Sequence, residues 1–125
     1  MELEEPRRIA QGTPGLSALL LFGSRARGEA RPGSDWDFAF LGGGVDPDRL
    51  RLDLARALAT DAVDLVDLTR ASALLRYRVA RDGVVLFEAA PGLVETFRVS
   101  AATFWCDIGP VVARAHDRVL EELGP

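Results

Sequence analysis

A run of seven almost wholly apolar residues, 16–22, ends at Gly23. A short run of this kind predicts a buried strand. Three further segments are predicted to be strands: 35–41, 62–68 and 84–87. Turn residues such as the Gly42-Gly43-Gly44 triplet break the chain between them, which favours a small sheet.

Helical periodicity occupies the intervals between these strands. Asp46 and Pro47 supply an N-cap and a first-turn proline for a helix that runs through residue 59. A second helix is predicted at 72–81, and short helices are expected within 2–11 and from Ser24, a good N-cap residue. The alternation predicts an α/β fold with a small mixed sheet and helices packed on one face.

The C-terminal part of the chain carries a sustained amphipathic pattern. Apolar residues recur three or four apart over 91–123, which predicts a long helix that Gly109-Pro110 kinks or splits. Phe104 belongs to this apolar stripe and is predicted to be a core residue. We interpret 1–125 as a single domain with a core at 16–88 and a helical C-terminal segment.

Composition excludes several kinds of site. The single cysteine, Cys106, rules out an internal disulfide framework and a cysteine-cluster zinc site. The single histidine, His116, argues against a histidine-rich metal site or a Ser-His-Asp hydrolase. A net charge of −4 is a poor match for duplex nucleic acid, so no direct nucleic-acid binding is expected. Because no signal peptide or membrane span is visible, we expect a cytoplasmic protein without membrane contact.

Gly23 and Ser24 lie between a buried strand and a predicted helix start. Backbone amides at such a position suit phosphate oxygens, glycine permits a close approach, and the serine hydroxyl can donate to a phosphate. Arg25, Arg27 and Arg31 follow closely and would help to neutralise a triphosphate. The segment therefore predicts a phosphate cradle.

Two carboxylates follow this cradle. Asp35 and Asp37 are two residues apart on a predicted strand, so both side chains lie on the same face. The alternating aromatic residues Trp36, Phe38 and Phe40 are predicted to point into the core. Two neighbouring carboxylates repel each other unless a cation lies between them, and Mg²⁺ takes carboxylate and phosphate oxygens together. A nucleotide-handling site is predicted.

A third carboxylate would complete a site for two metal ions, in which one ion activates the attacking oxygen and the other steadies the leaving group. The strand predicted at 62–68 offers Asp64 and Asp67, which are three residues apart and therefore point to opposite faces. Only one of them can join Asp35 and Asp37. Alternation alone leaves the choice open, because apolar residues flank both.

The segment Leu-Phe-Gly-Ser-Arg-Ala-Arg-Gly at 21–28, with Asp35-Trp36-Asp37 ten residues after Ser24, matches the signature Gly-Ser-x10-Asp-x-Asp. In this it resembles the DNA polymerase β-like nucleotidyltransferases, and in particular their minimal members, the MNT-domain antitoxins paired with HEPN-domain toxins. In that family the third acid is usually the first Asp of a Val-Asp-Leu-Val strand. The resemblance therefore favours Asp64 over Asp67.

The resemblance implies a nucleotidyltransferase fold and an enzyme that moves AMP from ATP to a hydroxyl, releasing pyrophosphate, with Mg²⁺ as cofactor and two ions expected. The implied acceptor is a tyrosine of a cognate HEPN ribonuclease toxin, which the modification silences. The implied catalytic and metal-binding residues are Asp35, Asp37 and Asp64, and the implied nucleotide-binding residues are Gly23, Ser24, Arg25 and Arg27.

Two alternative functions remain open at this point. The protein could neutralise its toxin by binding alone, through the apolar helix at 91–123, with the nucleotide site a relic. It could also modify a small molecule, as the similar aminoglycoside-modifying enzymes do. Those enzymes carry a further domain or subunit for the acceptor, for which 125 residues leave little room.

Overall fold

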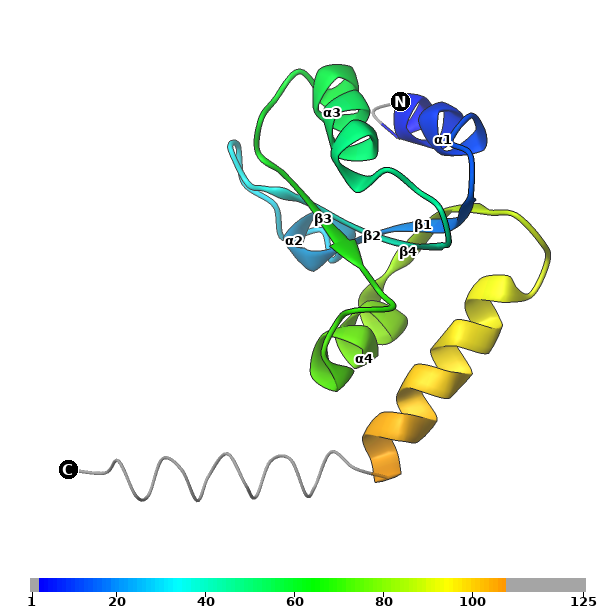
Figure 1. The fold of residues 1–125 in the computed structure, drawn as a ribbon. Helices are drawn as coiled ribbons and strands as arrows, with labels where there is room; N and C mark the ends of the chain where they lie inside the picture. Colours follow the sequence, from blue (N-terminus) through cyan, green and yellow to red (C-terminus); the bar gives the residue numbers. More distant parts are fainter. Residues whose placement is uncertain (1–2, 108–125) are drawn as a thin grey trace, which may run out of the picture.

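A computed structural model describes residues 3–107 of the chain (Figure 1). All four predicted strands are present, with ends within one residue of the prediction. A further helix, here called the C-terminal helix, begins at residue 93 and continues through 107. In chain order the other elements are α1 (Glu4–Gln11), β1 (Leu16–Phe22), α2 (Gly23–Ala26), β2 (Trp36–Gly42), α3 (Pro47–Leu58), β3 (Val63–Asp67), α4 (Ala73–Asp82) and β4 (Val84–Glu88).

Two helices, α3 and α4, begin where local sequence chemistry favours a start. The Asp46 carboxylate accepts a hydrogen bond from the Arg49 backbone N–H at 3.2 Å and caps α3, whose first turn contains Pro47. Ser72 caps α4 in the same way, because its hydroxyl accepts from the Leu75 N–H at 3.2 Å. Both starts confirm the sequence prediction.

The four strands form one mixed sheet in the order β3-β2-β1-β4. β1 is antiparallel to β2 and to β4, whereas β2 and β3 are parallel. The end of β1 therefore lies at the same edge of the sheet as the beginnings of the other three strands. Residues far apart in sequence meet at this edge.

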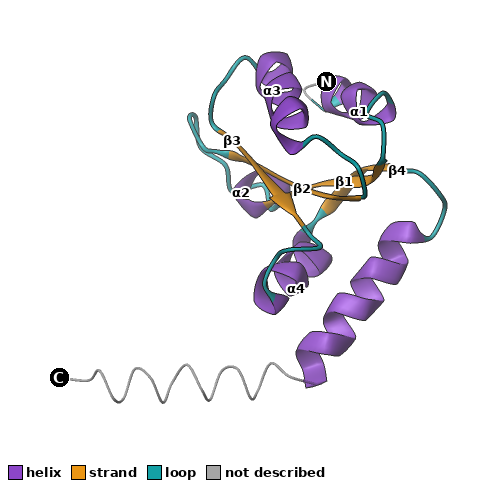
Figure 2. Cartoon of the chain, in the orientation of Figure 1, coloured by secondary structure: helices purple, strands orange, loops and turns teal. Residues whose placement is uncertain are grey.

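Helices cover both faces of the sheet, so the prediction that they pack on one face is wrong (Figure 2). On one face, Leu19 of β1 packs in a cluster with Leu54 of α3 and with α1. On the other, Leu20 packs with Val79 of α4 and Phe97 of the C-terminal helix. The physical reason is the apolar run in β1: a strand that is apolar at both alternating positions must be covered on both sides.

The C-terminal helix contributes its first turns to the core. Val94, Phe97 and Ala101 are buried, but Phe104 is 53% exposed, so its predicted core position is wrong. The helix slants away from the sheet toward its C-terminal end (Figure 1). Phe104 belongs to the last described turn of this helix. The predicted break at Gly109-Pro110 lies outside the described residues. No helix described in residues 3–107 combines the length and apolarity needed to cross a membrane.

Candidate active site

The edge of the sheet where β1 ends brings Gly23 directly against Asp37. Phe22 pairs with Asp37 in the β1–β2 ladder, so the next residue, Gly23, turns over the carboxylate. Gly23 has φ +74°, and a Cβ placed on it would lie 2.2 Å from Asp37 Oδ2. Glycine is required here both for its left-handed conformation and for this close approach. The Gly-Ser pair and the Asp-x-Asp pair of the sequence motif are therefore in contact through Gly23 and Asp37.

Ser24 does not cap α2, contrary to expectation. The helix begins one residue earlier, at Gly23, and Phe22 occupies the N-cap position without a side-chain hydrogen bond. Because α2 spans Gly23–Ala26, Ser24 lies within its first turn. Its hydroxyl is therefore not used as a cap at this helix start.

The parallel pairing of β2 and β3 distinguishes the two candidate third carboxylates. Asp64 is the direct partner of Asp37 in the ladder, so the two side chains point to the same face. Asp67 pairs with Phe40 instead. Its carboxylate accepts hydrogen bonds from the Thr69 backbone N–H at 2.9 Å and hydroxyl at 2.7 Å, which holds the turn after β3. The geometry thus brings together Asp37 and Asp64.

Trp36, Phe38 and Phe40 are buried, as predicted, which leaves Asp37 on the opposite face of β2. Asp35 is exposed and immediately precedes the strand. Burial raises the pKa of Asp37, and the nearby Asp64 and Asp35 carboxylates raise this pKa further, whereas Arg27 lowers it. Negative charge is therefore concentrated around Asp37.

These carboxylates have the donor chemistry that a hard divalent cation requires. Their oxygens are the ligands that Mg²⁺ takes, and a cation among them would relieve the repulsion that raises the pKa of Asp37. Within residues 3–107, no three Asp, Glu, His or Cys side chains already lie close enough together to hold a metal ion. The residues suit Mg²⁺ by type, and Asp37 and Asp64 share one face of the sheet.

The arginines after the glycine-serine pair differ in their surroundings. Arg25 donates from Nε and Nη2 to the Ser34 carbonyl oxygen, at 3.2 and 2.8 Å, and its guanidinium lies 4.0 Å from the centre of the Trp36 ring. It thus holds the residues on either side of Asp35. Arg27 is exposed and donates to Glu29 at 3.1 Å.

Arg31, in the loop before β2, is also exposed. Its backbone N–H donates to the Ser34 hydroxyl at 2.8 Å. This bond closes the turn that leads into Asp35, so the Arg31 backbone stabilises the loop before β2.

A hollow that sequence reasoning missed opens beside Gly23. Its volume is about 420 Å³, and its lining combines the turn after β1 with one side of α4: Phe22, Gly23, Arg27, Leu75, Arg78, Arg81 and Asp82. Arg78 is an exposed residue of α4. Its position next to Gly23 depends on which strand β4 joins, and no local pattern reveals that pairing.

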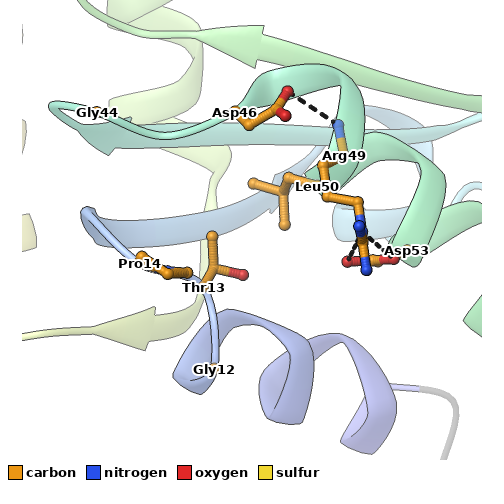
Figure 3. A pocket seen from close by; sticks show the side chains of 8 residues that line it. All are labelled: Gly12, Thr13, Pro14, Gly44, Asp46, Arg49, Leu50 and Asp53. Carbon is orange, nitrogen blue, oxygen red and sulfur yellow. Dashed lines mark hydrogen bonds and ion pairs between the residues drawn. The ribbon is translucent and has the colours of Figure 1, made fainter.

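A second hollow, of about 340 Å³, lies at the opposite end of the strands, between the loop before β1 and the start of α3 (Figure 3). Its charged groups already have partners: Arg49 donates to Asp53 at 3.2 Å, and Asp46 caps the helix. Its lining contains none of the carboxylates of the sequence motif. We therefore assign the active site to the Gly23 edge of the sheet.

Comparison with known proteins agrees with this geometry. The family described as "Polymerase beta, Nucleotidyltransferase" matches residues 4–91, so the chain belongs to this family of nucleotidyltransferases. Among individual proteins, it is similar to the protein adenylyltransferase MntA of Aphanizomenon flos-aquae (strain 2012/KM1/D3), with 35% identity. That match covers 65% of this chain and 63% of the relative, slightly less than two thirds of its length.

Solved structures of toxin–antitoxin complexes share the fold. A chain from a toxin–antitoxin crystal structure with AMP-PNP is 29% identical, with a TM-score of 0.82, and the match covers 96% of this chain and 99% of that one. A chain from the complex of a tri-AMPylated HEPN toxin of Shewanella oneidensis with an MNT antitoxin is 28% identical, with a TM-score of 0.73. That match covers 96% of this chain and 99% of the other.

Proposed function

We propose that this protein is an antitoxin that transfers AMP from ATP to a tyrosine hydroxyl of a HEPN-domain toxin. The observation that carries the proposal is the contact between Gly23 and Asp37, with Asp64 beside Asp37, in a member of the nucleotidyltransferase family. The similar structures include one with an ATP analogue and one with an AMPylated toxin, which favours this acceptor over a small molecule. Because the reaction uses ATP, we propose that the protein is cytoplasmic.

In this proposal the two motifs have separate tasks. The Gly23 backbone and the Ser24 hydroxyl bind phosphate oxygens of ATP. Asp35, Asp37 and Asp64 would hold Mg²⁺, with two ions expected. When bound, Mg²⁺ neutralises charge on the phosphates and lowers the pKa of the attacking hydroxyl. Proposing Asp64 rather than Asp67 for this role rests on its pairing with Asp37.

The transfer is an in-line displacement at the α-phosphorus. The acceptor hydroxyl oxygen forms a bond to that phosphorus, the bond to the α,β-bridging oxygen breaks, and pyrophosphate leaves. Asp64 accepts the proton of the hydroxyl. The protein contributes chiefly by positioning the reactants and stabilising charge.

Arg25 is a positioning residue in this scheme. Its bonds to the Ser34 carbonyl and its stacking on Trp36 fix the backbone on both sides of Asp35, and they occupy the guanidinium. Of Arg25 and Arg27, we propose that Arg27 faces the nucleotide. Its positive charge acts on Asp37, which places it near the carboxylates.

Intact mass spectrometry of a HEPN toxin tests the proposal directly. The toxin is incubated with this protein, Mg²⁺ and ATP, and its mass is expected to rise by whole AMP units. Asp35→Asn should abolish the shift, whereas Asp67→Asn, the matched loss of a carboxylate outside the site, should preserve it. A stable complex with no mass shift would refute the transferase and support neutralisation by binding alone.

A further inference from the structure

Arg51, a half-buried residue of α3, holds the backbone where β3 begins. Its Nε donates to the Val63 carbonyl oxygen and its Nη2 to the Asp61 carbonyl oxygen, each at 2.9 Å. The Asp61 oxygen also accepts from the Val63 backbone N–H at 2.8 Å, so the two carbonyls belong to one tight turn. Hydrogen bonds from a charged donor are stronger than neutral ones, and the planar guanidinium fixes the relative position of both oxygens.

The carbonyl of Val63 lies on the open side of the sheet. Among the strands of residues 3–107, β3 is outermost, so it has a neighbour, β2, on one side only. The Ala62 carbonyl points toward that neighbour, where it accepts from the Trp36 N–H at 2.8 Å. Successive carbonyls of an extended chain point to opposite sides. The Val63 carbonyl therefore points away from β2, and Arg51 supplies the donor that a further strand would otherwise provide.

The peptide that Arg51 holds is the one from which Asp64 starts. The Val63 carbonyl belongs to the planar peptide group that joins Val63 to Asp64, so fixing its oxygen fixes the direction in which the chain enters Asp64. Val63 is buried on the α3 face of the sheet, which places the Asp64 side chain on the other face, with that of Asp37. Within residues 3–107 the Asp64 carboxylate forms no hydrogen bond or ion pair of its own. Its orientation therefore depends on the backbone that Arg51 holds.

We infer that Arg51 is a positioning residue for AMP transfer, which holds the peptide between Val63 and Asp64 so that the Asp64 carboxylate is aligned with that of Asp37 for Mg²⁺ binding. The inference rests on the proposed function, because it deepens the role given there to Asp64. Mg²⁺ demands near-octahedral oxygen ligands at about 2.0–2.1 Å, so a small displacement of one carboxylate weakens the site. Residues that orient metal ligands typically contribute about 10–100-fold to metal affinity or activity.

Arg76 provides a matched control at the opposite end of β3. Its Nη1 donates to the carbonyl oxygen of Leu68, the residue after the strand, and its guanidinium lies 5.1 Å from the centre of the Phe97 ring. Arg76→Ala therefore removes the same charge and the same kind of carbonyl bond as Arg51→Ala, but away from Asp64. Both variants should lose some Tm in thermal unfolding, so any further difference between them is not due to stability.

Calorimetric titration of the isolated protein with Mg²⁺ is the first test. We expect Arg51→Ala to weaken Mg²⁺ binding about tenfold or more, and Arg76→Ala to change it less than about twofold. The sign is informative, because the loss of a positive charge alone would strengthen the binding of a cation. Arg51→Lys, a milder substitution, keeps the charge as a point on a flexible stem, so it should also bind Mg²⁺ more weakly than the wild type.

Transfer kinetics on the toxin are the second test. Arg51→Ala should lower kcat about tenfold or more while KM for the toxin stays within about twofold, because only the alignment of the metal site changes. In an Asp64→Asn background the same substitution should add less than about a twofold further loss, since two residues that act through one group are not additive.

Several results would overturn the inference. Unchanged Mg²⁺ affinity in Arg51→Ala, or recovery to the wild-type value in Arg51→Lys, would remove the positioning role. So would equal losses in Arg51→Ala and Arg76→Ala, or a further loss of about tenfold when Arg51→Ala is combined with Asp64→Asn, because Arg51 would then act through stability or through another group. A wild type that binds no Mg²⁺ would likewise exclude the role. A wild type that binds Mg²⁺ with the expected dependence on Arg51 but leaves the toxin mass unchanged would refute the transferase alone, so the two proposals fail separately.

Discussion

Replacing Gly23 by alanine tests the contact on which the active site depends. The new Cβ would lie 2.2 Å from Asp37 Oδ2, and also 3.1 Å from Cγ and 3.3 Å from Cβ of the same residue. Because three atoms of Asp37 crowd it, rotation of the carboxylate alone cannot relieve the overlap. Ordinary contact begins near 3.4 Å, so the nearest oxygen must retreat by roughly 1.2 Å.

The substitution should affect stability and activity by different amounts. Alanine at a positive φ costs about 1–2 kcal/mol, which lowers Tm by roughly 3–10 °C in a domain of this size. A displacement of about 1 Å in a catalytic site can cost about 100-fold in rate. We therefore expect Gly23→Ala to remain folded but to transfer AMP about 100-fold more slowly.

Gly28 provides a matched control. It has the same φ, +74°, but a Cβ on it would have no atom within 4 Å. Gly28→Ala should therefore show a similar loss of Tm and nearly normal transfer. Thermal unfolding by circular dichroism and the initial rate of AMP addition to the toxin, followed by mass spectrometry well below both Tm values, measure the two effects. Equal transfer rates in the two variants would refute the argument that Asp37 must lie against Gly23.

Three further predictions concern neighbouring residues. Asp37→Asn should raise Tm at pH 7 in the absence of Mg²⁺ while abolishing transfer. Because the folded-state pKa of Asp37 is raised, the protonated carboxyl contributes its full stability below the ordinary pKa of 3.8. This contribution is lost as pH rises through the folded-state pKa, so the gain in Tm from Asp37→Asn should fade in thermal scans at acidic pH. Asp64→Asn should reduce Mg²⁺-dependent transfer by at least about 100-fold and Asp67→Asn by less than about twofold in the same assay; the reverse order would exchange their roles. Arg25→Ala should lower the free energy of unfolding by about 1–3 kcal/mol, measured by urea denaturation, because it loses two hydrogen bonds and its stacking on Trp36. Arg25→Lys should not restore that loss, and full restoration would contradict the proposed geometry.

The sequence by itself identified the strands, the main helices and the central motif. Alternation placed Trp36, Phe38 and Phe40 in the core and left Asp37 on the other face, because side-chain direction along a strand follows directly from spacing. The apolar run of β1 also contained the signal that both faces of the sheet are covered, although we predicted helices on one face. These features are local, so neighbouring residues suffice to reveal them.

Alternation left Asp64 and Asp67 open and the family resemblance favoured Asp64, but only the tertiary structure paired Asp64 with Asp37 and brought α4 beside Gly23. The first depends on the register between β2 and β3, and the second on β4 pairing with β1 rather than with β3. The close approach of Gly23 to Asp37 likewise appears only in the folded chain. Strand partners and register are set by the combined packing of both faces and by chain connectivity, which local periodicity does not encode.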